Sequence, residues 1–94
     1  MNKYETVIIM SNEVSDEKRK EVLNKVKDQI IKNGKIDSVE ELGERVLAYE
    51  IKKHKKAYYY VINFELQAEE IAELERLYRI TDEILKFIVV RKEK

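Results

Sequence analysis

Apolar residues along the chain follow two spacings, which predict strands and helices in a definite order. Alternation of apolar and polar positions over residues 4–10, 36–51, 58–66 and 85–91 predicts four strands. Apolar residues three or four positions apart, over residues 15–34 and 68–78, predict two amphipathic helices. The chain therefore runs strand, helix, strand, strand, helix, strand.

Residues that start, bend and end these elements support this order. Ser15 is a favourable N-cap for the first helix, and we expect Gly34 to end it in the left-handed conformation. Gly43 lies inside the second strand pattern and predicts a bulge or a bend, and the basic run 52–56 is expected to form the next turn. The order βαββαβ is that of an α+β, ferredoxin-like fold, a four-stranded antiparallel sheet with two helices on one face.

The third strand indicates which face of the sheet the helices cover. One face carries residues 58, 60, 62, 64 and 66, all of which are tyrosine or apolar, whereas the other carries Tyr59, Val61, Asn63 and Glu65. Burying the second set would leave Asn63 and Glu65 without evident partners, so we expect the first set to form the core.

The face without helices is predicted to carry an apolar patch contributed by three strands. Its expected members are Val7, Ile9, Tyr59, Val61, Ile88 and Val90. Single apolar residues are normal on a surface, but a continuous patch from several strands favours a protein partner.

Lysines followed by tyrosines, in IKKHKKAYYYVINF (residues 51–64), raise the alternative of an RNA-stacking sheet. The RNA-recognition motif has the same element order, and its signature agrees with this stretch at Lys56, Tyr58, Tyr60 and Val61. The signature fails at positions 57, 59 and 63, and its stacking aromatics would be Tyr58 and Tyr60. Both lie on the expected core face, so the pattern disfavours a stacking platform.

Composition narrows the possible function classes. The 94 residues, expected to form a single domain over 1–94, are 40% charged with a formal net charge of zero, so no overall positive field attracts nucleic acid. With no cysteine and one histidine, a metal site is not expected, and SNEVSDE is acidic where an acylphosphatase of this topology would bind an anion. We predict no enzyme activity, catalytic residue, cofactor or small-molecule substrate. No signal peptide or membrane span is predicted, which indicates a cytosolic protein.

The segment VEELGERVLAYEIKK, residues 39–53, resembles the bacterial small-subunit ribosomal protein S-six family. That family's pattern runs Gly, any residue, basic, usually polar, Leu, Ala or Ser, Tyr, any residue, Ile, then usually basic. This chain supplies Gly43, Arg45, Leu47, Ala48, Tyr49, Ile51 and Lys52. It departs at Val46, where a polar residue is usual, and at Glu50, where proline is common. YETVIIM, AYYYVINFEL and RITDEILKFIVVR also resemble the family, so the resemblance covers essentially the whole chain.

This resemblance implies a non-enzymatic structural component of the small ribosomal subunit. Family members pair with ribosomal protein S-eighteen, and the pair binds the central domain of the small-subunit ribosomal RNA. A neutral protein can bind RNA jointly with a basic partner, because the partner supplies phosphate neutralisation. The alternative function is a regulatory or dimerisation module of the same fold that acts through its open sheet face.

Local basic residues are the candidates for RNA contact. Arg45 fills the basic position of the family pattern, residues 52–56 form a basic tip, and Lys86 and Arg91 lie on the fourth strand. The predicted RNA-binding set is Arg45, Lys52, Lys53, Lys55, Lys56, Lys86 and Arg91. Solvated surface charge is the alternative for Arg45 and the tip. For the fourth strand, which we expect at the edge of the sheet, the alternative is charge that prevents unwanted strand pairing. We expect His54 to be solvated within the tip, and Leu47 and Tyr49 to pack in the core.

Overall fold

The computed structural model describes residues 1–92 and contains the predicted strands and helices in the predicted order. They are β1 (Asn2–Ser11), α1 (Asp16–Asn33), β2 (Lys35–Ile51), β3 (His54–Leu66), the short 3₁₀ helix η1 (Ala68–Glu70), α2 (Ile71–Ile80) and β4 (Ile84–Arg91). The strands are antiparallel in the order β2-β3-β1-β4, which confirms the ferredoxin-like fold.

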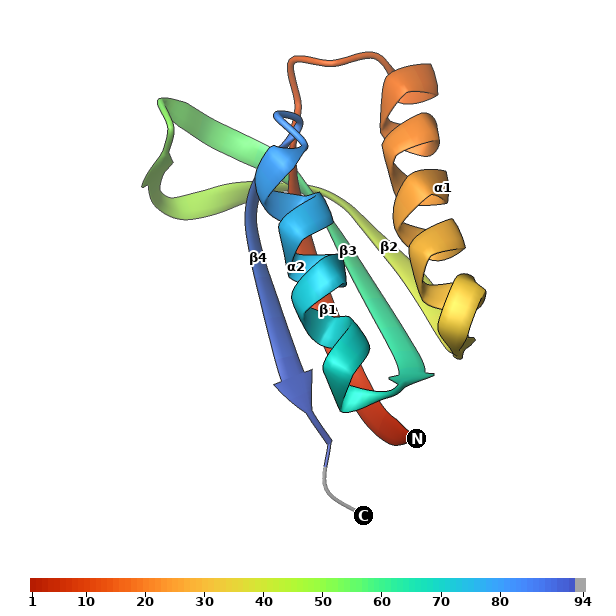
Figure 1. Ribbon diagram of the computed structural model, residues 1–94. Coiled ribbons are helices and arrows are strands. Elements are labelled where there is room, and N and C mark those ends of the chain that lie inside the picture. Colours follow the sequence, from red (N-terminus) through yellow and green to blue (C-terminus); the bar gives the residue numbers. More distant parts are fainter. Residues whose placement is uncertain (93–94) are drawn as a thin grey trace.

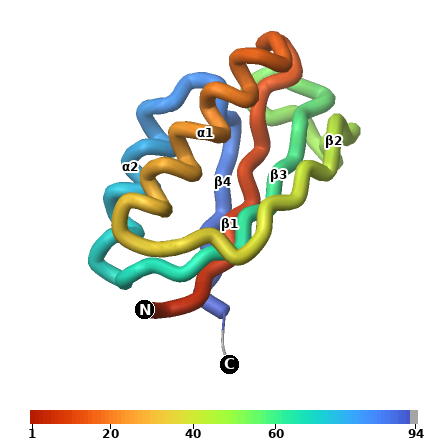
Figure 2. The backbone as a smooth tube through the Cα atoms, turned by 90° about the vertical axis from the view of Figure 1, so that its right-hand side faces the viewer, coloured from red at the N-terminus to blue at the C-terminus, as the bar shows by residue number. Residues whose placement is uncertain are grey.

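Both helices lie on the same face of the sheet, here called the helix-covered face. Figure 1 shows α1 and α2 in front of the strands, and the side view in Figure 2 separates the helix layer from the sheet layer. The other face, here called the open face, is not covered by either helix. Among residues 1–92, no helix is long and apolar enough to cross a membrane.

The core lies between the helices and the sheet, on the face that the sequence predicts. In β3 the side chains of Tyr60, Ile62, Phe64 and Leu66 are at most 5% exposed. The apolar stripe of α1, from Val22 to Ile30, and Leu74 of α2 pack against them. The predicted assignment of the β3 faces is therefore confirmed.

One polar contact crosses this core from β1 to α2. The hydroxyl of Thr6 lies 3.0 Å from the carbonyl oxygen of Ile88, which can only accept, and 3.1 Å from the hydroxyl of Tyr78. Thr6 therefore donates to Ile88 and accepts from Tyr78. Burial raises the pKa of Tyr78 well above its usual value, so this hydroxyl stays protonated. Each buried hydroxyl thus has a partner, which burial of polar groups requires.

The two glycines act through different physical constraints. The prediction that Gly34 ends α1 in the left-handed conformation is wrong, because its φ is −156°, which is extended backbone. A side chain at Gly34 would overlap the carbonyl oxygen of Glu65, so glycine is needed there for close approach of α1's end to β3. Gly43 has φ +81° where the β2–β3 register shifts, and this confirms the predicted bulge.

The β2–β3 hairpin is longer and its turn is tighter than the sequence predicts. β3 begins at His54, so the turn comprises only Lys52 and Lys53, and the expected turn over residues 52–56 is too long. Both lysines have positive φ, 49° and 69°, a conformation that two-residue hairpin turns require and that asparagine or glycine usually supplies. Figure 1 shows this hairpin projecting beyond the helix-covered part of the sheet.

We predict that alanine at the two glycines will destabilise the fold by different amounts. Gly34→Ala should lower the free energy of unfolding by at least about 3 kcal/mol, because the added methyl group meets backbone that cannot move alone. Gly43→Ala should cost only about 1–2 kcal/mol, because nothing lies within 4 Å of the new atom and only the backbone conformation is unfavourable. Urea denaturation measures both values. Equal costs, or the reverse order, would contradict the close approach at Gly34.

Candidate functional site

An apolar row crosses the open face over β3, β1 and β4. Val7 of β1 pairs with Val61 of β3 on one side and with Ile88 of β4 on the other. Val90 follows two positions along β4, so its side chain points to the same face. Ile88 and Val90 are 45% and 51% exposed, while Val7 and Val61 are partly exposed. These four residues form a continuous surface, here called the open-face patch.

The other two residues predicted for this patch are covered by the β2–β3 hairpin. Ile9 lies on the open face as expected, yet it is only 6% exposed. It forms a second, smaller core with Leu47, Ala57 and Leu85, and Tyr59 packs against this cluster. Because the hairpin supplies the cover from within the chain, Ile9 offers no free surface and Tyr59 forms only the border of the patch.

Leu47 and Tyr49 have different environments, although strand alternation places them on one face. Leu47 is 8% exposed, as predicted, but Tyr49 is 65% exposed, so its predicted core position is wrong. The cause is a register shift between Val46 and Ile51, which breaks the alternation in the hairpin. The Tyr49 hydroxyl instead lies 3.2 Å from Nζ of Lys86, whose ammonium group is also 5.8 Å from the tyrosine ring.

His54 ties the end of the hairpin to the end of β1, and the prediction that it is solvated is wrong. Its side chain is 14% exposed. Nδ1 lies 3.0 Å from the carbonyl oxygen of Lys52 and must donate to it, which leaves Nε2 to accept from the hydroxyl of Ser11 at 3.0 Å in the neutral ring. The backbone amide of Glu13 donates to the same hydroxyl. We call this arrangement the His54 clasp.

The structure brings most of the predicted RNA-binding residues to one region but separates one of them. Five lie exposed along the hairpin: Arg45, Lys52, Lys53, Lys55 and Lys56. Lys86, at the start of β4, joins this group through its contact with Tyr49. Arg91 lies at the opposite end of β4, where its guanidinium donates to the side chain of Asn2 at 3.1 Å. The basic hairpin is therefore one candidate RNA-binding site, and Arg91 lies outside it.

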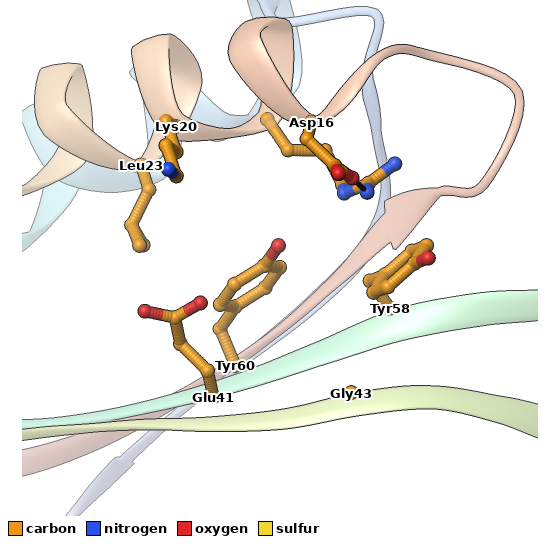
Figure 3. A pocket seen from close by; sticks show the side chains of 8 residues that line it. Asp16, Lys20, Leu23, Glu41, Gly43, Tyr58 and Tyr60 are labelled. Atoms are coloured by element: carbon orange, nitrogen blue, oxygen red, sulfur yellow. Dashed lines mark ion pairs between the residues drawn. The ribbon is translucent and has the colours of Figure 1, made fainter.

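A second basic feature, buried Arg19, is explained by contacts within the chain. Its guanidinium donates to the carbonyl oxygen of Val14 at 2.7 Å, pairs with Asp16 and lies 3.7 Å above the centre of the Tyr58 ring. Figure 3 shows the hollow of about 390 Å³ beside it, with Asp16 on α1 and Tyr58 and Tyr60 on β3. Burial raises the pKa of Tyr60, and the charge of Arg19 opposes this rise. These contacts satisfy Arg19, which holds the loop before α1.

In residues 1–92, no three side chains of the ligating types His, Cys, Asp or Glu converge.

Comparisons with known proteins agree on one family. The sequence model of the family described as Ribosomal protein S6 matches residues 3–91. The small ribosomal subunit protein bS6 of Alkaliphilus oremlandii is 43% identical over the full length of both chains. That of Helicobacter acinonychis is 46% identical over 97% of this chain, but this chain spans only 65% of its length.

A solved structure supports the same relationship at the level of the fold. The 30S ribosomal protein S6 from Thermotoga maritima has 39% sequence identity and a TM-score of 0.93. The match covers 97% of this chain and 87% of that chain.

We predict that the His54 clasp holds the hairpin in place without supporting the main core. His54→Ala removes two hydrogen bonds, so it should raise hydrogen exchange of the amides in residues 47–56 by an amount equivalent to about 1–2 kcal/mol of local stability. Amides of the β1–β3 ladder over residues 2–9 should keep their protection. Lys55→Ala, in the same hairpin and exposed, is the matched control and should change neither group. A uniform loss of protection across the sheet would instead assign His54 to the main core.

Proposed function

The chain belongs to the ribosomal protein S6 family, whose members are structural components of the small ribosomal subunit and not enzymes, and we propose that it acts there through two adjacent surfaces. The open-face patch pairs with ribosomal protein S-eighteen, and the basic hairpin then contacts the central domain of the small-subunit ribosomal RNA. The observation that carries this proposal is the juxtaposition of an apolar patch with a basic hairpin on one protein of zero net charge.

The apolar half of the proposal rests on surface that the chain itself leaves uncovered. The hairpin folds over Ile9 and stops short of Val7, Ile88 and Val90. A continuous apolar surface gains free energy when a partner removes it from water, at about 25 cal/mol per Å² of apolar area buried. Polar neighbours limit its extent, since Glu5 lies between Val90 and Asn63 across the strands. A partner would therefore bind with its apolar contact centred on Val7 and its polar contacts at this border.

The basic half of the proposal explains how a neutral protein can contribute to RNA binding. Phosphate contacts release counterions, so each cation on the hairpin can add affinity even where the whole protein has no net charge. Arg45 pairs in register with Ala57, which belongs to the smaller core on the open face. Paired residues point to the same face, so the hairpin presents Arg45 on the open-face side. A basic partner bound to the patch would supply the remaining neutralisation. RNA binding should therefore need both proteins.

A direct test of the proposal is capture from cell lysate, scored for ribosomal protein S-eighteen and for small-subunit ribosomal RNA. Recovery of both by the wild-type chain supports the proposal. A homodimer that recovers neither would favour the alternative of a dimerisation module.

We predict that patch and core substitutions will separate partner binding from stability. Val61→Asp should weaken partner binding with little loss of stability, because the side chain is partly exposed on the open face. Phe64→Ala, at the core side of the same strand, should destabilise folding by about 3–5 kcal/mol. Ile31→Asp introduces the same charge on the exposed side of α1 and is the control for binding. Partner affinity by calorimetry and urea denaturation provide the measurements. Similar destabilisation by both strand variants, with partner affinity intact, would contradict the assignment.

We predict weak binding of ribosomal RNA by the chain alone and strong binding by the pair. Log affinity falls as log salt concentration rises, and Arg45→Ala should reduce the magnitude of this slope by roughly one, because it removes one phosphate contact. The reduction should be the same for all RNA sequences. Neutralising the lysines of residues 52–56 should reduce the slope further. Lys32→Ala, an exposed lysine on α1, is the control.

The same titration would also reveal a different mechanism. Tight, sequence-selective binding by the chain alone, lost in Tyr58→Ala or Tyr60→Ala without loss of folding, would replace phosphate contact by base stacking.

A further inference from the structure

A basic hollow lies at the edge of β4, between the end of α2 and the tip of the β2–β3 hairpin. Its volume is about 330 Å³, and it opens on the surface. Three cations from three different elements line it, namely Lys52 of the hairpin turn, Arg79 of α2 and Lys86 of β4. No carboxylate side chain lines it, although Asp82 and Glu83 lie in the turn between α2 and β4. The charged side chains that line the hollow are thus all cations. A concave surface of one charge sign raises the local concentration of ions of the opposite sign, here anions.

The floor of the hollow is rigid because it belongs to the two cores of the protein. Tyr78 and Ile84 are 1% and 4% exposed and are part of the main core, while Leu85 belongs to the smaller core on the open face. Phe87 packs against Tyr78 with tilted rings, whose centres are 4.8 Å apart. The hollow is therefore formed before any ligand arrives, which reduces the entropic cost of binding.

The contacts that these three residues make within residues 1–92 leave hydrogen-bond donors available on each cation. The carbonyl oxygen of Lys52 accepts from His54 in the clasp, which fixes the backbone but not the ammonium group. Lys86 contacts the Tyr49 hydroxyl, a neutral partner. One terminal nitrogen of Arg79 donates to the carboxylate of Glu75 at 3.3 Å. The guanidinium lies 5.8 Å from the centre of the Phe87 ring.

Within residues 1–92, the charges of this hollow are only partly compensated. In residues 1–92, neither Lys52 nor Lys86 forms an ion pair with a carboxylate. Arg79 has the one pair with Glu75, at an exposed position where such pairs contribute little. An arginine with free donors suits an oxyanion, because its planar fork can donate two parallel hydrogen bonds to phosphate oxygens.

We propose that this hollow binds a phosphodiester of the RNA backbone, with Arg79 as its central ligand and with Lys52 and Lys86 at either side. The inference rests on the proposed function, since it names a further contact for the RNA that the basic hairpin meets. Lys52 belongs to both surfaces, so one RNA strand can pass from the hairpin into the hollow without crossing an uncharged gap. The volume accommodates a phosphate together with its ribose, and the open mouth suits a group carried by a chain that continues on both sides.

Arginine substitutions on α2 provide a matched test in the complex with the basic partner. Arg79→Gln should lower affinity for ribosomal RNA about five- to tenfold at ~0.1 M salt and reduce the salt slope by roughly one. Arg76→Gln is the control, because Arg76 lies on the same helix, also pairs with a glutamate and does not line the hollow. Thermal unfolding of both variants should match, since each loses one exposed ion pair.

Two results would overturn the inference in distinguishable ways. If Arg79→Gln binds RNA like the wild type while Arg45→Ala loses affinity, the proposed function stands and the hollow is not a contact. If the wild-type pair does not bind RNA at all, the proposed function fails. Titration of inorganic phosphate, followed by amide chemical shifts in residues 84–87, then examines the hollow alone. Shifts that Arg79→Gln abolishes would show an anion site that does not serve RNA, which also rejects the assignment to RNA.

Discussion

The pairing of β1 with β3 is the constraint on which the rest of the structure depends. These central strands are in register without interruption from Asn2 opposite Leu66 to Ser11 opposite Ala57, whereas both edge ladders contain register shifts. A slip of one residue in this ladder would turn every side chain of β3 to the other face. Phe64 and Ile62 would then lose the helices that cover them, and the open-face patch would lose Val61. The same ladder therefore determines both the core and the candidate partner surface.

Much of the fold could be predicted from the sequence, because its signals are local and periodic. Alternation in β3 separates Phe64 from Glu65, and the penalty for burying a carboxylate determines which of them faces the helices. A glycine inside a strand pattern predicts a bulge or a bend, and Gly43 forms the bulge with a positive φ. Gly34 was predicted as a glycine that ends α1, but with the wrong conformation. Its true constraint is the carbonyl oxygen of Glu65, a residue far along the chain, and no local pattern carries that information.

The candidate site was less predictable, because the hairpin bends through contacts between distant residues. His54 lies among lysines, and such charged neighbours predict a solvated side chain. In the structure, however, its two ring nitrogens bond to the Ser11 hydroxyl and to the Lys52 carbonyl oxygen. Tyr49 follows the same alternation as Leu47 until a register shift separates them. The family pattern contains Leu47 and Tyr49 but does not describe their environments. No local pattern singles out Arg79 as a site residue, because its place beside Lys52 and Lys86 depends on how α2 meets the hairpin.

The position of β1 in the sheet also affects the time course of folding. β1 is synthesised before both of its neighbours, which come from the second half of this chain, and Tyr4 pairs with Arg91. β1 therefore stays unpaired on both edges until β3 exists, and on one edge until β4 is complete. Contacts that span so much of the sequence close slowly, because the loop entropy is lost before the contacts form. During synthesis this apolar strand is the segment most exposed to misassociation, and completion of the last strand ends that exposure.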